Sequence, residues 1–556
     1  MSKERKARFR TLSDIELKSV YGPEDLPYFN ELSEAAKREI LEAHEKHFGA
    51  PGKPPFLRGI YELGYRAQLP TIRQFCGRGT AEDTNELLHY LISLGETGVS
   101  IAYDAPTLYA RDSDNEDWSF GYVGKDGVAV DTFADYKDLF RGIQREKFAV
   151  SQTINLPAIV FFCMDLLLAK EQKINLKKLR GTIQSDMRKE AIGQKAYRFS
   201  LTHGMRLEGD MMEFAIRNLD FGFYPVNSSG YHMSEQGASS AQELTFTFEN
   251  AFVLLEYCLS RGMNIDDVAG RMSCFFNCKG FWEEIAKFRA ARKIWYETIK
   301  SEYGAKNPRS LALKFHVQNS GASFKRQEPR NNVIRGSLHY LAAFLGGAQS
   351  IHLNSWDEEM ALPSVEAVKE AIRTQQIVGE EMNIADVVDA VGGSYYLEWH
   401  TREIERRVKE YFGIIDKLGG MQRAIELGYP QLEIKKTSLA EAERTNQGSP
   451  EIVIVGVNKH FDLASAEREE KEIFDKMIRV PTLETHQKQK ERLAKVKRGR
   501  DERVVEKCLK RLADEARGGG NLVEPVTEAV GSYATVEETM IKTLEPVFGR
   551  WRGPGD

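Results

Sequence analysis

The chain has 556 residues, of which 42% are hydrophobic and 29% are charged, a composition typical of a globular protein that buries a large core. Its 77 basic and 82 acidic residues give a net charge of −5, so there is no excess of positive charge for a nucleic-acid partner. No apolar run approaches the ~20 residues of a membrane span, and the charged start, MSKERKARFR, lacks the apolar stretch of a secretory signal. Cys274 and Cys278 lie close in sequence, but no second pair or nearby histidine completes a metal site, so we expect buried thiols in a cytoplasmic protein.

The first 50 residues differ from the rest of the chain. They are charged and lead into the Pro- and Gly-rich stretch GAPGKPPF (49–56). Because Pro and Gly interrupt regular structure, we predict that residues 1–50 form an N-terminal arm outside the main domain.

Eight short β-prone runs follow, and helix-length segments such as 156–173 and 279–301 lie between most of them. We interpret these segments as amphipathic helices. Strands that alternate with helices are typical of parallel βαβ units, and eight units indicate an α/β fold, a (β/α)8 TIM barrel over residues 51–362. The runs are TIRQF (71–75), GVSIAYD (98–104), FAVSQTI (148–154), LRGTIQS (179–185), FGFYPVN (221–227), RMSCFFN (271–277), LALKFHV (311–317) and QSIHLNS (349–355).

The rest of the chain frames this barrel. The pattern from 363 to 450 is mainly helical, and we expect this segment to pack on the barrel. Residues 451–556 are predicted to be a C-terminal linker and helices, with a single strand at EIVIVGVN (451–458). The charge run HQKQKERLAKVKRGRDER (486–503) is interpreted as a solvated helix surface, and GGG (518–520) ends it before a final pair of amphipathic helices.

Polar side chains gather where the predicted strands end, and this is where TIM barrels carry their active sites. Most are neutral hydrogen-bonding groups, and Arg271 is the one clear cation. Such a set suits a phosphate-bearing ligand with a carbonyl that needs a hydrogen-bond donor. It does not suit hydrolysis, because no nucleophile with a base beside it stands out. The residues are Thr182, Gln184, Tyr231, His232, Arg271, Ser273, His316, Gln318, Asn354 and Glu358.

Each of these residues also has a plain structural interpretation. A histidine at a strand end is more often structural than catalytic, Arg271 could anchor a loop, and Phe75 could simply pack inside the barrel. The chain contains neither G-x-x-x-x-G-K-[ST] nor G-x-G-x-x-G, and GRGT (77–80) is too short to count as either motif. The residues alone therefore indicate a barrel enzyme and do not identify its reaction.

At these same positions the sequence resembles the adenosylcobalamin-dependent acyl-CoA mutases, the methylmalonyl-CoA mutase family. The matching strings occur in the same order over roughly residues 20–460, which makes chance similarity improbable. The resemblance implies a barrel that closes around a CoA thioester, whose chain threads along the barrel axis. The strings are YGPEDLP (21–27), TIRQF (71–75), DSDN (112–115), GVAVDT (127–132), GTIQSD (181–186), SSGYHMSEQGA (228–238), RMSCFF (271–276), KFRAARKIWYE (287–297), HVQNSG (316–321), QSIHLNSWDEEMALP (349–363) and VGGSYYLE (391–398).

The resemblance implies roles for individual residues. His232 would hydrogen-bond the thioester carbonyl and stabilise the rearranging acyl radical, with Tyr231 and Gln184 beside it. The substrate-binding residues would be Phe75 between substrate and adenosyl group, Thr182 and Gln194 in the acyl pocket, and Arg271 and Ser273 at the CoA phosphates. The residues expected on the cofactor side are Ala102, His316, Gln318, Asn354 and Glu358.

Three positions bear on the acyl group. Methylmalonyl-CoA mutases resemble this chain but have Tyr where Phe75 stands and Arg, which pairs with the substrate carboxylate, where Gln194 stands. With Phe and Gln at these two positions, the sequence resembles isobutyryl-CoA mutase, whose substrate has an uncharged acyl group. The 2-hydroxyisobutyryl-CoA mutases place Ile at the Phe75 position and Asp where Ala102 stands, and alanine cannot hydrogen-bond a hydroxyl. The resemblance therefore favours interconversion of isobutyryl-CoA and n-butyryl-CoA, or of a close uncharged branched acyl-CoA such as pivalyl-CoA.

Family members bind cobalamin through a flavodoxin-like domain with the motif D-x-H-x-x-G, whose histidine ligates cobalt. The motif is absent from this sequence, so the resemblance implies that the chain lacks this domain and that a separate small subunit supplies the ligand, as in the two-subunit mutases. We therefore expect a large subunit that binds acyl-CoA, needs adenosylcobalamin and is inactive alone. Its assembly would be a hetero-oligomer, for example a heterotetramer.

Some positions depart from the family pattern. Ile60, Leu63 and Gly64 replace Pro, Thr and Met of R-G-P-Y-x-T-M-Y, whose residues touch the CoA chain, and Lys314 replaces an Arg. Three alternatives stay open: a non-catalytic scaffold of a cobalamin protein, a 2-hydroxyisobutyryl-CoA mutase large subunit, and a methylmalonyl-CoA mutase subunit that uses another cation such as Arg206.

Overall fold

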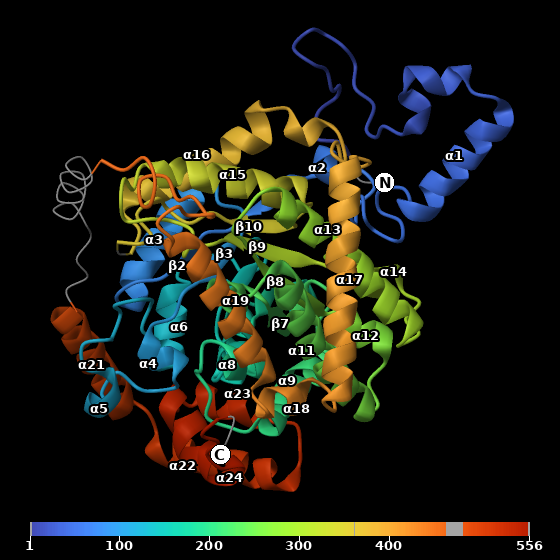
Figure 1. Ribbon diagram of the computed structural model, residues 1–556. Coiled ribbons are helices and arrows are strands. Elements are labelled where there is room, and N and C mark those ends of the chain that lie inside the picture. Colours follow the sequence, from blue (N-terminus) through green and yellow to red (C-terminus); the bar gives the residue numbers. More distant parts are fainter. Residues whose placement is uncertain (1–2, 361, 463–481, 554–556) are drawn as a thin grey trace.

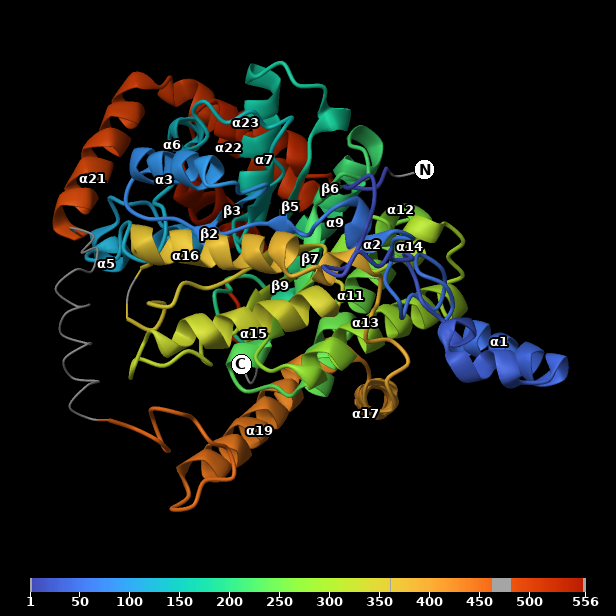
Figure 2. The same cartoon turned by 90° about the horizontal axis from the view of Figure 1, so that it is seen from above.

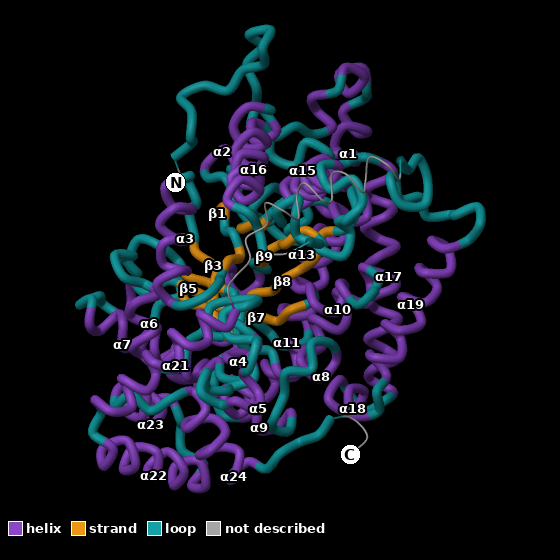
Figure 3. The backbone as a smooth tube through the Cα atoms, turned by 90° about the vertical axis from the view of Figure 1, so that its left-hand side faces the viewer, coloured by secondary structure: helices purple, strands orange, loops and turns teal. Residues whose placement is uncertain are grey.

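Short parallel strands at the centre of the molecule form the barrel. The computed structural model describes residues 3–360, 362–462 and 482–553, and helices surround the strands on all sides in two views (Figures 1 and 3). All eight predicted β-prone runs contain strand, which confirms the predicted α/β barrel architecture. The strands are β1 (Thr71–Ile72), β2 (Phe75–Cys76), β3 (Val99–Ile101), β4 (Val150–Gln152), β5 (Gly181–Ile183), β6 (Phe223–Tyr224), β7 (Val226–Ser229), β8 (Met272–Cys278), β9 (Phe315–Asn319) and β10 (Ser350–His352).

The barrel is split into two five-stranded parallel sheets, ordered β1-β10-β9-β8-β7 and β2-β3-β4-β5-β6. The first and fifth runs are each divided, so that β1 pairs with β10 while β2 pairs with β3, and β6 pairs with β5 while β7 pairs with β8. Each divided run therefore belongs to both sheets. The eight runs follow one another in the ring order of a TIM barrel, opened at these two places.

Helices follow the strands and cover the outside of the barrel, which produces the alternation seen in the sequence. They are α3 (Ala81–Ser93), α4 (Ala105–Leu108), α5 (Glu116–Ser119), α6 (Phe133–Leu139), α7 (Ala158–Glu171), η3 (Leu176–Lys178), α8 (Met187–Ile192), α9 (Leu201–Asn218), α10 (Tyr231–Glu235), α11 (Ser240–Ser260), α12 (Ile265–Ala269), α13 (Trp282–Ser301), α14 (Pro308–Leu311), α15 (Asn331–Leu345) and α16 (Val365–Gln376).

The arm stands apart from this body. It contains η1 (Pro23–Asp25), η2 (Pro27–Glu31) and α1 (Glu34–His47), and α1 projects away from the barrel in both ribbon views (Figures 1 and 2). None of the α1 residues is buried. The short α2 (Gly64–Ala67) then leads into the first strand.

A second layer of helices lies outside the barrel on the side of α13. The segment after α16 contains η4 (Ile377–Glu381), η5 (Ile384–Asp386), α17 (Tyr395–Lys417), α18 (Met421–Glu426) and α19 (Tyr429–Asn446). The buried guanidinium of Arg289 on α13 donates to Glu398 on α17 at 2.6 Å, and Lys293, one turn further along α13, pairs with Glu405, two turns further along α17. These ion pairs join α17 to α13, and the two helices run in the same direction.

The C-terminal helices cover the opposite side, around α7. They are α21 (Thr482–Gly499), α22 (Glu502–Gly518), α23 (Val523–Gly531), η6 (Glu538–Leu544) and α24 (Glu545–Phe548), and Figure 2 shows them beside α3, α6 and α7. Eleven of the 14 residues of α7 are buried, and Val523, Val526 and Val530 of α23 belong to the same apolar cluster. The expectation of an amphipathic helix over 156–173 is therefore wrong, because α23 covers the face that would otherwise meet water.

The basic run 486–503 does not form a fully solvated surface. On one face of α21, His486 bonds the carbonyl of Ser113 at 2.8 Å and Gln489 donates to Asp131 at 2.8 Å, and both side chains are buried. Arg492 pairs with Asp135 at 2.6 Å. The prediction is wrong for this face, because its polar groups meet the carbonyl of Ser113 before α5 and the carboxylates of Asp131 and Asp135 at the start of α6.

The predicted strand at 451–458 does not form. Val453 and Val455 are 45% and 48% exposed, and this stretch has only a bridge between Val455 and Lys459. The Asn458 side chain accepts a hydrogen bond from the N–H of Ile454 and donates to the carbonyl of Ile452, which closes the chain into a turn. In the part of the chain that the structure describes, no neighbouring strand pairs with these β-prone residues.

None of the helices that the structure describes is long and apolar enough to cross a membrane.

The ion pair between Arg145 and Asp165 on α7 gives a stability prediction. The guanidinium donates to both carboxylate oxygens, at 2.8 and 2.6 Å, and both side chains are at most 1% exposed. The variant Arg145→Met should lose about 3–5 kcal/mol of unfolding free energy, because it leaves Asp165 charged and unpaired in the core. Urea unfolding followed by circular dichroism measures this loss. The double variant Arg145→Met/Asp165→Leu should recover most of it, and a single variant within ~1 kcal/mol of the parent would contradict the argument.

Candidate functional site

A cavity of about 1030 Å³ passes through the barrel. Its lining includes residues that precede the strands, such as Lys147 and Arg180, residues within the strands, and residues that follow them, such as Tyr231 and His232. It therefore runs along the barrel axis from the amino ends of the strands to their carboxyl ends. A volume of this size suits a large small-molecule ligand.

Small hydroxyl side chains keep the middle of the barrel open. Ser100, Ser151 and Thr182 are neighbours in register on three adjacent strands, and all three line the cavity. On the other sheet, Ser273 accepts a hydrogen bond from Asn227 at 2.8 Å, and Ser350 lies in register with His316. TIM barrels usually fill this space with Val, Ile and Leu. We call the channel that these small residues leave the bore.

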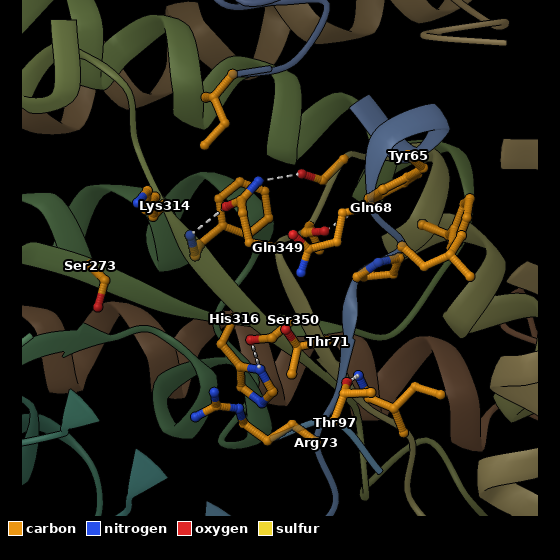
Figure 4. Close-up of a pocket in the computed structure, with 18 of the residues that line it drawn as sticks. Tyr65, Gln68, Thr71, Arg73, Thr97, Ser273, Lys314, His316, Gln349 and Ser350 are labelled. Atoms are coloured by element: carbon orange, nitrogen blue, oxygen red, sulfur yellow. Dashed lines mark hydrogen bonds between the residues drawn. The ribbon is translucent and has the colours of Figure 1, made fainter. Parts of the chain in front are cut away.

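The amino-end mouth of the bore is cationic. Lys147 and Arg180 are exposed there. Lys314 also lines the cavity (Figure 4), and its ammonium donates to the hydroxyl of Tyr224 at 2.8 Å. Ile60, Leu63 and Gly64, which depart from the family pattern, also line the cavity at this mouth. Cations at an open mouth are positioned to meet phosphates.

The structure does not bring Arg271 to this mouth. Its guanidinium donates to the carbonyls of Leu219 and Asp267, at 3.0 and 3.2 Å, and its carbon lies 4.0 Å from the centroid of the Phe221 ring. Arg271 is 4% exposed and is not among the residues that line the cavity. The predicted contact of Arg271 with the phosphates is therefore wrong. At the amino end of β8 its side chain points outward, where it holds two backbone segments. Arg206 does not line the cavity either, because its guanidinium donates to the carbonyls of Ala516 and Gly520 near the C-terminus.

His316 lies inside the bore with Arg73 beside it. Figure 4 shows the guanidinium of Arg73 next to the imidazole, whose Nδ1 is 2.7 Å from the hydroxyl of Ser350. Burial lowers the pKa of His316 well below its usual value, and the charge of Arg73 lowers it further. Burial also lowers the pKa of Arg73 to about 10, against the opposing effect of Glu96. His316 is therefore a neutral hydrogen-bonding group at neutral pH.

His232 stands at the carboxyl-end side of the bore. It belongs to α10, directly after β7, and its Nδ1 lies 3.0 Å from the hydroxyl of Ser229. Burial lowers its pKa well below the usual value, and the nearby charge of Lys189 lowers it further. If Ser229 donates to Nδ1, the neutral ring carries its proton on Nε2, where it can be donated to a ligand.

Tyr231 and Phe75 are held in place by a chain of hydrogen bonds. Tyr231 stacks on Phe275, with ring centroids 4.8 Å apart, and its hydroxyl accepts from Gln318 at 3.0 Å. Gln318 and His352 both bond the side-chain oxygen of Asn354, at 3.0 and 2.7 Å. The other nitrogen of His352 accepts from the backbone N–H of Phe75 at 2.9 Å. Phe75, Tyr231 and Gln318 line the cavity, and Asn354 supports them from behind.

Two more predicted residues differ in their access to the cavity. Glu358 lines it, and burial raises the pKa of this carboxyl to about 7, with Asp357 adding to the shift. At neutral pH it can therefore both donate and accept hydrogen bonds. Ala102 is 5% exposed and does not line the cavity, since its backbone pairs with Cys76 and Val128.

A buried lysine stands behind the cavity wall at Gln184. The Nζ of Lys189 is 3.4 Å from the Oε1 of Gln184 and 3.0 Å from the Oε1 of Gln194. Asn155 also donates to the Oε1 of Gln184, at 2.9 Å, so the amide Nε2 of Gln184 is the end left to donate to a ligand. Gln184 lines the cavity. Gln194 does not line it, and its side chain is linked to Gln184 by the hydrogen bonds of Lys189.

Sequence reasoning missed three features of this site. Ser100 and Ser151 carry hydroxyls in the two β-prone runs that precede the run of the predicted Thr182, and this repetition is a signal that could have indicated a hollow barrel. Lys189 and Arg73 lie within quoted motifs or directly after them, but no local pattern shows that either charge is buried beside the bore. Among the described residues, no group of three or more His, Cys, Asp and Glu side chains could hold a metal ion.

Comparison with known proteins agrees with this geometry. A model of the family described as methylmalonyl-CoA mutase matches residues 10–550. The 2-hydroxyisobutanoyl-CoA mutase large subunit of Aquincola tertiaricarbonis is 37% identical over 99% of this chain and 93% of its own length. The methylmalonyl-CoA mutase of Cereibacter sphaeroides is 37% identical over 98% of this chain and 73% of its own, and the mitochondrial enzyme of Homo sapiens is 36% identical over 92% and 67%. With nearly its whole length matched, the chain belongs to the methylmalonyl-CoA mutase family and is an acyl-CoA mutase.

Proposed function

We propose that the chain is the substrate-binding large subunit of an adenosylcobalamin-dependent acyl-CoA mutase that interconverts isobutyryl-CoA and n-butyryl-CoA, or a close uncharged branched acyl-CoA. The observation that carries the proposal is the bore, which leads from a cationic mouth past small hydroxyls to His232 and Gln184. A CoA thioester has matching parts in the same order: phosphates, a thin chain with amide groups, and a thioester carbonyl.

The phosphates and the chain would be bound by the amino-end half of the cavity. Lys147, Arg180 and Lys314 are among the cations that line it, and they would meet the phosphates in place of the buried Arg271. Ser151, Thr182 and Ser273 would offer hydroxyls to the amide groups of the chain. Their small volume leaves room for a ligand that a barrel packed with branched residues would exclude.

The thioester carbonyl would be held at the carboxyl-end half. His232 would donate from Nε2 to the carbonyl oxygen, where negative charge grows as the acyl radical rearranges, and Gln184 would donate from Nε2 beside it. Because both groups are neutral, they bind the carbonyl without protonating it. Tyr231, stacked on Phe275, would close this end of the pocket and help to exclude water.

The donor set at the carboxyl ends fits the nucleoside of adenosylcobalamin. Gln318 and Tyr231 offer neutral hydrogen-bonding groups, and Glu358, with a pKa of about 7, can donate to or accept from ribose hydroxyls. When bound, adenosylcobalamin would supply the radical chemistry that removes and returns a hydrogen atom of the acyl group. Phe75, fixed by His352, would separate the substrate from the adenosyl group.

We propose that a separate small subunit supplies the cobalt ligand. The support is a relative named as a large subunit, which this chain matches over 93% of that protein's length. The assembly would then be a hetero-oligomer of large and small subunits.

An uncharged acyl group is supported by the residues around its pocket. Gln194 is neutral, and the ammonium of Lys189 beside it is paired with Glu190 at 2.5 Å. Ala102, which does not line the cavity, has no side-chain group for the hydroxyl of a 2-hydroxyisobutyryl substrate.

The direct test is a panel of substrates. The chain would be mixed with adenosylcobalamin and a small cobalamin-binding subunit from the same organism, and products would be separated by chromatography. We expect turnover of isobutyryl-CoA, with methylmalonyl-CoA slower by roughly a thousandfold, because its carboxylate would be buried without a free cation. Preferred turnover of methylmalonyl-CoA or 2-hydroxyisobutyryl-CoA would overturn the substrate assignment. Absence of turnover, together with absence of butyryl-CoA binding, would favour a non-catalytic scaffold.

The double variant Phe75→Tyr/Gln194→Arg tests the acyl pocket within the same assay. The longer Arg side chain would bring a cation to the side of the cavity held by Gln184, so the ratio of methylmalonyl-CoA to isobutyryl-CoA turnover should rise at least roughly tenfold. An unchanged ratio would show that Gln194 does not set the charge preference.

The variant His232→Ala tests the carbonyl donor. Its turnover should fall by about 10²–10³-fold, as when an enzyme loses one donor to a developing negative charge, while the affinity for butyryl-CoA changes little. His89→Ala serves as the control, because His89 is exposed and far from the bore. Turnover of the His232 variant equal to that of the control would remove His232 from the mechanism.

The variant Ser151→Phe tests the bore. An aromatic ring at this position should weaken butyryl-CoA binding at least roughly a hundredfold in isothermal titration, because the ring would occupy the channel through which the ligand threads. The same exchange at exposed Ser260 is the matched control and should leave affinity unchanged. Unaltered binding by the Ser151 variant would mean that the ligand does not thread the barrel.

A further inference from the structure

One cation near the acyl end of the cavity is not used by the proposed function. Lys189 is fully buried, and its Nζ points at the Oε1 of Gln184, a residue of the cavity wall. Its charge is close enough to His232 to lower the pKa of that ring. A single side chain therefore separates this ammonium from the space in which the acyl group would lie.

The charge of Lys189 is neutralised by its neighbour in sequence. The carboxylate oxygen Oε1 of Glu190 accepts from Lys189 at 2.5 Å and from Asn155 at 2.6 Å, and its Oε2 accepts from the N–H of Ala196. Among the described carboxylates, only that of Glu190 lies within ion-pair distance of Lys189. The nearby Asp186 is engaged instead by backbone N–H groups, including that of Ser229.

The amides around this pair provide a path toward the cavity. Lys189 and Asn155 each donate to both Glu190 and Gln184, and Lys189 also donates to Gln194. Without the carboxylate of Glu190, the ammonium would keep two amide oxygens as partners, and one of them belongs to the cavity wall. A lysine side chain is flexible enough to shift its charge by a short distance in that direction.

We propose that Lys189 is a latent cation for carboxylate-bearing acyl groups, and that its pairing with Glu190 makes the pocket select uncharged ones. The inference rests on the proposed function, because it deepens the substrate preference of the same site. It assigns that preference to a buried ion pair behind the wall, in addition to the residues at positions 75 and 194. Glu190 thereby acts as a specificity-determining residue without contacting the acyl group.

The test is a comparison of binding, which requires neither the cofactor nor turnover. The affinities of the full chain for butyryl-CoA and succinyl-CoA would be measured by isothermal titration in the parent and in Glu190→Gln. The parent should prefer butyryl-CoA, and the variant should shift the ratio toward succinyl-CoA at least roughly tenfold, because the freed ammonium can pair with the carboxylate of the ligand. The double variant Glu190→Gln/Lys189→Met should return the ratio to that of the parent.

A second buried Lys–Glu pair provides the matched control. Lys287 pairs with Glu243 at 2.7 Å, is equally buried and lies outside the cavity lining. Glu243→Gln should destabilise the protein without moving the binding ratio. If the parent binds butyryl-CoA and Glu190→Gln leaves the ratio unchanged, or the double variant keeps the shift, the latent-cation inference is wrong while the proposed function stands. Failure of the parent to bind either thioester would overturn the proposed function and this inference with it.

Discussion

The small side chains inside the barrel are the constraint on which the rest of this structure depends. Ser100, Ser151 and Thr182 occupy positions where a TIM barrel usually places branched apolar residues, so the interior contributes a channel instead of a packed core. Apolar burial must then come from the layer between strands and helices and from the helices outside it. This explains why α7 is buried on nearly every side and why α23 and α17 form second layers on opposite sides of the barrel.

Buried charge is used in the same layer to fix positions. Arg145 with Asp165, Lys287 with Glu243, and Lys189 with Glu190 are ion pairs whose side chains are at most 1% exposed. Such pairs contribute little net stability over apolar residues, but breaking one partner is costly, so each pair locks a local arrangement. At Lys189 this lock lies beside the cavity wall, and the same electrostatics that fix Gln184 also determine whether a free cation is available to a ligand.

Burial also determines the chemistry of the cavity. The pKa values of His232 and His316 both lie well below the usual value because water is excluded and cations stand nearby. The groups that face the bore are therefore mostly neutral donors and acceptors. This suits the proposed rearrangement of an acyl radical, in which a carbonyl would be polarised without acid–base chemistry that would divert the reactive centre.

The sequence by itself determined the eight strand-forming runs and their parallel order, and most of the site residues that it predicted line the cavity. Alternation of β-prone runs with helices is a local property, and the strand ends must converge at one end of a barrel, so His232, Gln184 and Gln318 could be placed together in advance. Only the tertiary structure decided the rest. Whether Arg271 points into the bore or outward, whether α7 is covered by α23, and whether residues 451–458 find a partner strand depend on contacts between segments far apart in the chain. The pairing of Lys189 with Glu190 is adjacent in sequence, but its place behind Gln184 follows from the fold, because no local pattern shows which wall of the barrel a buried charge will face.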